Sequence, residues 1–265
     1  MIVSDQHKLL FVHIPKCGGT TIKTVLRPID TRRERFQNWD ITDHPVLGRI
    51  DYGQLPMAII RGHFPDKFAL FNTYRSFALV RDPMRRLCSA VNHRLKVVKR
   101  SPLTSLDQTT LQTEADEAIA LLERHKGDAM LPTSLIHFTR QWDYVALEGQ
   151  MMVSDIFPLS HLEMMLQAMS KHAGRNLSPP PRTEAVAYGN ARLARLDALV
   201  QPLLKRMLPR SAWKPLFVSA KRGLMAAGLL SPEKADRLDQ FLSPDQRQFI
   251  QAYYEKDYGL LDNTT

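Results

Sequence analysis

The sequence predicts an α/β protein with a small parallel central sheet flanked by helices in three layers and a largely helical C-terminal half. Short apolar runs such as Leu9–Ile14 and Phe77–Val80 are rich in branched or aromatic residues, and each leads into a turn and a helical pattern. Alternation of strands with helices favours parallel pairing. Because 44% of the 265 residues are hydrophobic, the chain can bury a substantial core, and we expect one domain over residues 1–265.

The first strand leads into a loop with the features of an anion site. Pro15 ends the strand, and a helix follows after two glycines. Glycines let the backbone approach a ligand, while the first amide groups and the dipole of a helix favour negative charge. A lysine adds a mobile cation that a simple chain reversal would not need. The predicted anion-binding residues are Lys16, Cys17, Gly18, Gly19, Thr20 and Thr21, with either threonine in the first helical turn or at the cap.

This loop is P-loop-like, but its residue order differs from both common nucleotide-binding motifs. A Walker A loop places its lysine after the last glycine, whereas Lys16 precedes Gly18 and Gly19. The sequence also lacks the GxGxxG pattern of dinucleotide-binding folds. A nucleotide kinase stays open as an alternative, although a kinase would need a magnesium-binding hydroxyl directly after the lysine, where Cys17 stands.

A second short strand is predicted at Met57–Ile60, and it ends in Arg61, Gly62 and His63. The glycine before His63 and the proline two residues after it indicate a turn at the strand end. Strand ends are where α/β proteins carry functional side chains. His63 is therefore either a site residue or a hydrogen-bonded structural histidine, and this segment alone leaves both interpretations open.

The third strand, Phe77–Val80, runs directly into a predicted helix, with Asp82 as a good N-cap and Pro83 as a good first helical residue. Arg81 at the strand end and Ser89 two turns into the helix can both face the edge of the sheet. A guanidinium and a hydroxyl there suit a phosphate group. Taken alone, Arg81 could instead pair with Asp82, and Ser89 could be an ordinary exposed residue.

The rest of the chain is predicted to be mainly helical. Residues 31–54 indicate a polar surface connection with one short helix, and residues 151–157 a fourth strand. Residues 209–230 are basic and apolar, which fits a packed helix or a segment that lies on a membrane or holds an acidic acceptor. Further helices are predicted at about 107–125, 133–142, 160–174, 184–207, from 231, and 243–259.

Two of these helices carry capping-box patterns, Ser160 with Glu163 and Ser243 with Gln246. Gly174 is predicted to end the first of them and Gly259 the last helix.

The formal net charge of +9 is concentrated in one stretch. Residues 61–100 carry ten Lys or Arg against two Asp, whereas residues 101–150 carry three Lys or Arg against eight acidic residues. A local excess of this kind indicates a specific anionic ligand. A polyanion-binding or nucleic-acid-binding module remains an alternative function, although no zinc-finger, RNP or basic-zipper pattern is present.

The two cysteines, Cys17 and Cys88, show neither metal-ligand spacing nor a disulfide framework, so we expect a reducing compartment. For Cys17 a small loop-filling role is favoured over a reactive thiol. No signal-peptide pattern and no window of 18 apolar residues is present, and we expect a cytoplasmic protein.

Three blocks of the chain resemble the sulfotransferase superfamily, specifically the carbohydrate branch that includes heparan sulfate 2-O-sulfotransferase-like enzymes. Residues 11–20, FVHIPKCGGT, are similar to FVHIPKTGGT of that family. The C-terminal LSPDQRQFIQAYYEKDYGLL is similar to the family's closing helix. The family pattern RDPxxRxxS is matched by Arg81, Asp82, Pro83, Arg86 and Ser89.

The resemblance implies an enzyme that moves a sulfuryl group from PAPS to a hydroxyl of a glycan or glycolipid, leaves PAP as product and uses no metal. In that family the first block binds the 5′-phosphosulfate of PAPS. The resemblance therefore implies that Lys16 both binds the 5′-phosphosulfate and acts as a catalytic residue. Arg81 and Ser89 would hold the 3′-phosphate. The family's strand-end histidine, a base acting on the acceptor hydroxyl, would correspond to His63.

The sequence departs from the family in three respects. Cys17 stands where threonine is common, which should be tolerated because backbone amides bind the ligand. No N-terminal Golgi anchor is found, which implies a bacterial-type soluble enzyme. We expect no nucleic-acid partner. Residues 209–231 match no family segment and are a possible insertion or acceptor-recognition segment, with peripheral membrane contact as one option.

Possible contributors to adenine contacts are Arg140, Gln141, Arg182 and Thr183.

Overall fold

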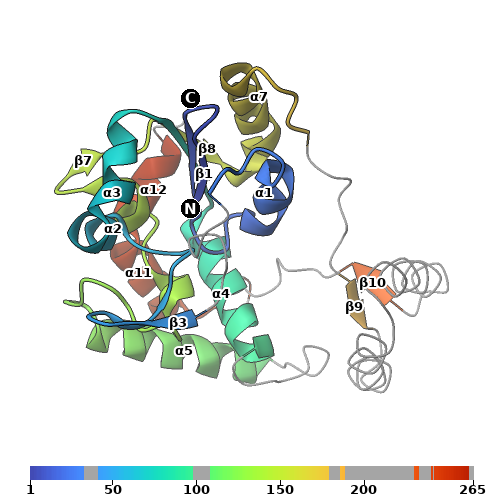
Figure 1. The fold of residues 1–265 in the computed structure, drawn as a ribbon. Coiled ribbons are helices and arrows are strands. Elements are labelled where there is room, and N and C mark those ends of the chain that lie inside the picture. The colour runs from blue at the N-terminus through green and yellow to red at the C-terminus, as the bar shows by residue number, and fades with distance from the viewer. Residues whose placement is uncertain are drawn as a thin grey trace, which may run out of the picture.

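The computed structural model describes residues 1–32, 41–97, 108–178, 186–188, 230–232, 240 and 242–262 (Figure 1). Its strands are β1 (Ile2–Ser4), β2 (Leu9–Val12), β3 (Ile41–His44), β4 (Gly48–Asp51), β5 (Arg75–Val80), β6 (Ala146–Leu147), β7 (Gln150–Met151), β8 (Asp155–Pro158), β9 (Val186–Tyr188) and β10 (Leu230–Pro232). Its α-helices are α1 (Gly19–Leu26), α2 (Met57–His63), α3 (Pro65–Phe68), α4 (Pro83–Val97), α5 (Gln108–Arg124), α6 (Trp142–Val145), α7 (Leu162–Ala173), α11 (Pro244–Tyr253) and α12 (Glu255–Asp262).

A four-stranded sheet in the order β1-β2-β5-β8 forms the centre of the molecule. Strand β2 pairs parallel with β5, β5 pairs parallel with β8, and β1 is antiparallel at one edge. Phe11 of β2 lies opposite Phe77 of β5, and both side chains are buried. Strands buried on both faces read as continuous apolar runs. The predicted α/β class with a small parallel sheet is thereby confirmed.

Helices cover both faces of this sheet. Helix α7 packs against β2, β5 and β8, whereas α12 contacts β8 and α6. Figure 1 shows α1 and α7 on one side of the sheet and α12 on the other. A second apolar core lies between α4, α5 and α11, where Leu95, Leu122 and Ile250 are buried. The described part of the chain therefore has the predicted layered arrangement.

Several predicted helix boundaries are confirmed. The Asp82 side chain accepts a hydrogen bond from the Arg85 N–H at 2.8 Å, as expected for the N-cap of α4. Ser243 and Gln246 form a complete capping box at α11. Gly174 ends α7 in the left-handed conformation, with φ of 62°. These local signals act within one turn of the chain, so the sequence alone determines them.

The predicted strand at Met57–Ile60 is wrong, because these residues form the first part of helix α2. Met57, Ile59 and Ile60 are buried, whereas Ala58 between them is exposed. A run of four residues is too short for its periodicity to separate helix from strand. His63 is consequently the last residue of a helix, not a residue of a strand-end turn.

Other local predictions also differ from the structure. Residues 41–51 form the β3–β4 hairpin, where a polar connection with a short helix was expected. The N-cap of α7 is His161, and no side chain caps the helix, so the Ser160 capping box is wrong. Gly259 lies within α12 and does not close it. Residues 133–142 contain only one turn of 3-10 helix, Ile136–Phe138, before α6 begins.

The helices predicted at 184–207 and from 231 overlap two short strands, β9 and β10, which pair antiparallel. Pairing between distant segments has overridden local helical pattern at these positions. Most of residues 179–241 lie outside the described residues, including the 209–229 segment and the positions Arg182 and Thr183. In the part of the chain that is described, no helix combines the length and apolar character needed to cross a bilayer.

Candidate active site

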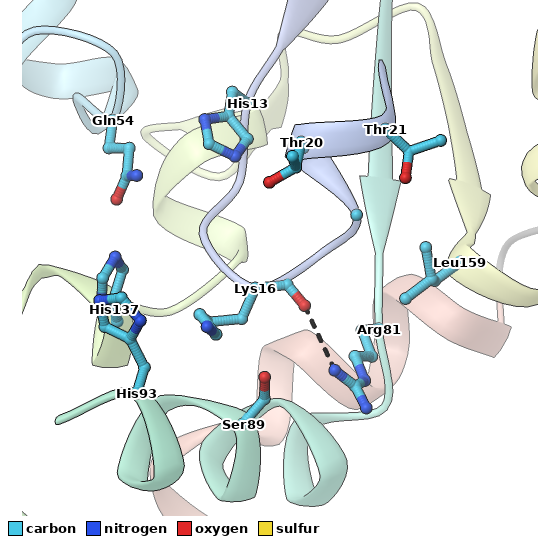
Figure 2. A pocket seen from close by; sticks show the side chains of 12 residues that line it. His13, Lys16, Thr20, Thr21, Gln54, Arg81, Ser89, His93, His137 and Leu159 are labelled. Atoms are coloured by element: carbon cyan, nitrogen blue, oxygen red, sulfur yellow. Dashed lines mark hydrogen bonds between the residues drawn. The ribbon is translucent and has the colours of Figure 1, made fainter. Parts of the chain in front are cut away.

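Both predicted anion-binding segments line one pocket at the end of the central sheet (Figure 2). Its volume is about 420 Å³, within the range of small-ligand sites. Two cationic side chains face it, and none of its described lining residues is acidic. This charge pattern fits an anionic ligand. The lining residues are His13, Lys16, Gly18, Gly19, Thr20, Thr21, Gln54, Arg81, Ser89, His93, His137 and Leu159.

The loop between β2 and α1 owes its shape to its glycines. Gly18 is the N-cap of α1 and has a φ of 78°, a conformation that glycine adopts readily. A Cβ atom on Gly19 would overlap the His13 ring, so the close approach requires glycine there. The first amides of a helix have no partner within the helix. The predicted placement of Thr20 and Thr21 in the first turn of α1 is confirmed.

Lys16 also lies in the left-handed region, with φ of 68°. Such a conformation costs a non-glycine residue about 1–3 kcal/mol and recurs at functional sites. In Figure 2 the Lys16 side chain extends into the pocket between Ser89 and the two histidines below Gln54. The strained backbone thus aims an ammonium group at the space where a ligand would lie.

Arg81 and Ser89 approach the same pocket from β5 and α4. The Arg81 Nη1 atom lies 3.5 Å from the Lys16 carbonyl oxygen, which brings the two predicted segments into contact (Figure 2). Asp82 is used as the N-cap of α4, and no ion pair of Arg81 is found among the described residues. Ser89 lines the pocket. The alternatives of an Arg81–Asp82 pair and a solvent-facing Ser89 therefore lose their support.

Cys17 is buried beneath the loop and does not line the pocket. Burial raises the pKa of its thiol to about 12, so the sulfur stays protonated at neutral pH. The thiol donates a hydrogen bond to Gln141 Oε1 at 3.2 Å. The loop-filling interpretation is thus favoured over a reactive thiol, and the side chain links the loop to a distant segment.

Three histidines on the pocket wall were not singled out as site residues by the sequence. His93 lies four residues after Ser89, so both lie on the same face of α4. Its ring meets that of His137 edge to face, with centroids 4.3 Å apart. Burial lowers the pKa of both His13 and His137 to about 3. The four-residue spacing from Ser89 could have predicted from the sequence that His93 faces the pocket. His137 reaches the pocket only through the tertiary fold.

A family model described as "Sulfotransferase family" matches residues 1–262. The match covers nearly the whole chain. This chain belongs to the sulfotransferase family. No curated protein and no solved structure matches it at a significant level. The protein is therefore an enzyme that transfers a sulfuryl group to an acceptor, and the family implies PAPS as the sulfate donor.

The pocket of this sulfotransferase has groups that suit an anionic donor of this kind. PAPS carries a 5′-phosphosulfate and a 3′-phosphate, and the pocket offers a helix N-terminus with a lysine on one side and an arginine on the other. The space beside Gly18 and Gly19 is taken up by the side chains of Leu159 and His13, which pack closely against the loop backbone. The described residues contain no group of three or more metal-ligand side chains placed to hold an ion, and a metal-free reaction stays a prediction.

His63 lies outside the set of residues that line this pocket. It is exposed at the end of α2, where its ring packs edge-on against His44 with centroids 5.9 Å apart. His44 in turn contacts Phe64, which makes a small aromatic cluster beside His63. The role of His63 as a base stays a prediction from the family resemblance.

Arg86, the second arginine of the RDPxxRxxS motif, does not line this pocket. Its side chain is only 1% exposed and donates hydrogen bonds to the carbonyl oxygens of His137 at 3.1 Å and Thr139 at 2.6 Å. It also lies 3.8 Å from Asp257 and over the Tyr254 ring. Of the two arginines in the motif, Arg81 therefore lines the pocket, whereas Arg86 forms buried contacts that stabilise the fold.

The two buried pocket histidines predict acid sensitivity of the fold. Their pKa is lowered to about 3 in the folded state. Below about pH 6.5 these two histidines therefore become protonated in the unfolded chain but stay neutral in the folded chain. The free energy of unfolding should fall with decreasing pH by up to about 1.4 kcal/mol per pH unit for each histidine. Urea unfolding between pH 7 and 5 would measure it. A His137→Asn variant should show a shallower slope, and an identical slope would contradict this account.

Proposed function

We propose that the protein transfers the sulfuryl group of PAPS to a hydroxyl group of a carbohydrate acceptor, a glycan or glycolipid, with the pocket as the donor site. One observation carries the proposal. Lys16 with its glycine loop and Arg81 with Ser89 lie far apart in the sequence, yet they line one pocket without acidic side chains among its described lining. The absence of acidic lining favours a ligand with several negative charges.

In this proposal each side of the pocket has a separate task. The loop amides and the Lys16 ammonium hold the 5′ side and stabilise charge that develops between the transferring group and the leaving phosphate. The Arg81 guanidinium and the Ser89 hydroxyl hold the 3′-phosphate. PAPS supplies an activated sulfuryl group, and its transfer resembles phosphoryl transfer, where positioning and charge stabilisation carry most of the catalysis.

The proposed base for the acceptor hydroxyl is His63, as the family resemblance implies. Its aromatic neighbours support a sugar site, because aromatic faces pack well against the apolar faces of sugar rings. One observation favours a second candidate, His137, because this histidine lines the proposed donor pocket, whereas His63 does not.

The donor half of this proposal predicts selectivity for a 3′-phosphate. The wild-type protein should bind PAP at least about tenfold more tightly than AMP, because a charge-assisted hydrogen bond contributes about 1.5–3 kcal/mol. Arg81→Ala should reduce that ratio to a few-fold in calorimetric titrations. Arg85→Ala is the matched control, since Arg85 is an exposed arginine on α4, four residues after Arg81. Equal affinity of the wild type for PAP and AMP would refute the donor site.

The acceptor half is tested with the same proteins by following PAP release from PAPS in the presence of unsulfated polysaccharides and glycolipids. His63→Ala should bind PAP normally but lose about 10²–10⁴-fold in transfer, the usual effect of removing a general base. If His63→Ala retains transfer and His137→Ala loses it with PAP binding intact, the base is His137.

A further inference from the structure

A buried glutamine joins the two halves of the donor pocket. Gln141 has no exposed surface, and its carboxamide pairs with both backbone polar groups of Arg81. Gln141 Oε1 accepts from the Arg81 N–H at 2.8 Å, and Gln141 Nε2 donates to the Arg81 carbonyl oxygen at 2.8 Å. Arg81 directly follows β5, and the Gln141 side chain satisfies its backbone N–H and carbonyl groups as a neighbouring strand would. This pairing lies at the residue whose guanidinium lines the pocket.

The same carboxamide oxygen also binds the phosphate-loop side of the pocket. Gln141 Oε1 accepts from the Cys17 thiol at 3.2 Å, and Cys17 lies between Lys16 and Gly18 in the loop. Since burial keeps this thiol protonated, it remains a hydrogen-bond donor at neutral pH. One oxygen atom therefore contacts both segments that are proposed to hold the donor.

Gln141 is itself held in place by a buried carboxylate. The two oxygens of Asp257 accept from the N–H groups of Gln141 at 2.8 Å and Trp142 at 2.9 Å. Asp257 is fully buried on α12, and Arg86 lies 3.8 Å away. Two hydrogen bonds from adjacent N–H groups to one buried carboxylate hold this segment in place. The position of the carboxamide is therefore anchored from the far side of the pocket wall.

We propose that Gln141 is a positioning residue of the donor site, which sets the spacing between the Lys16 loop and the Arg81 guanidinium. This inference rests on the proposed function. Because Gln141 is buried and does not line the pocket, a direct adenine contact is not its role. A ligand with phosphate groups at both the 5′ and 3′ positions must reach both segments at once, whereas AMP needs only one. Loss of the link should therefore lower affinity for PAP more than for AMP.

The test is Gln141→Met, which keeps the length of the side chain and removes its hydrogen bonds. Calorimetry should show the PAP-to-AMP affinity ratio reduced to the few-fold value expected for Arg81→Ala, since a displaced guanidinium loses its charge-assisted hydrogen bond to the 3′-phosphate. A merely structural role would lower stability without changing this ratio. Gln246→Met is the matched control, because Gln246 is also buried and hydrogen-bonded, to Gln112 and Asp116, away from the pocket.

Cys17→Ala provides a second, milder variant that removes the bond between the loop and Gln141, together with a longer contact of 3.6 Å between the thiol and the Pro15 carbonyl oxygen within the loop. It should lower the PAP-to-AMP ratio by a smaller factor, and it serves alone if Gln141→Met does not fold. An unchanged ratio in folded Gln141→Met, or in Cys17→Ala where it stands alone, would overturn this inference. A wild-type protein that does not distinguish PAP from AMP would instead refute the donor site itself, so the two failures differ.

Discussion

Replacing Lys16 with glycine should reduce sulfuryl transfer by about 10²–10³-fold while the fold stays intact. The side chain reaches the proposed donor pocket, where its charge would stabilise the transferring group and the leaving phosphate. Its backbone has a φ of 68°, which glycine adopts without strain. Relief of that strain offsets the extra chain entropy of glycine, so the thermal midpoint should move by only a few degrees.

The measurement is PAP release from PAPS with the acceptor mixture, together with a thermal melt of each variant. Lys23→Ala is the control, because this substitution also removes one positive charge, but Lys23 lies on α1 outside the pocket lining. It should retain nearly full transfer. Comparable losses in both variants would mean that net charge matters and the position of Lys16 does not.

Replacing Arg86 with methionine should have the largest effect on stability, about 3–5 kcal/mol. The change removes the hydrogen bonds to two carbonyl oxygens and leaves the Asp257 carboxylate buried without its cation. Burial already raises the pKa of Asp257, and Arg86 opposes that rise. Relative to wild type at the same pH, the loss should shrink in acid, because a protonated Asp257 needs no counter-charge.

Chemical denaturation at pH 7 and pH 5 measures both effects. Arg85→Met, one residue earlier and exposed, should change the free energy of unfolding by no more than about 0.5 kcal/mol. A loss below 1 kcal/mol in Arg86→Met would show that the buried pair contributes little.

Strong local signals made much of the fold predictable. The apolar run in β2, the glycine loop after it, and the Arg81–Asp82–Pro83 sequence after β5 each depend on residues within one turn of chain. Their strand and helix types are accordingly confirmed, and so is the α11 capping box. The segment at Met57–Ile60 failed because four apolar residues fit either structure, and burial against distant residues decided for a helix.

The sequence by itself determined the parallel sheet, the glycine loop and the arginine and serine that share its pocket, because these follow from short-range patterns and from strand ends that meet at one edge. The tertiary structure alone decided that Arg86 is buried, that His137 reaches the pocket and that Gln141 joins Cys17 to Arg81. These contacts join residues far apart in the chain, and no spacing in the sequence encodes them. They form only when the segment before α6 packs between α4 and α12.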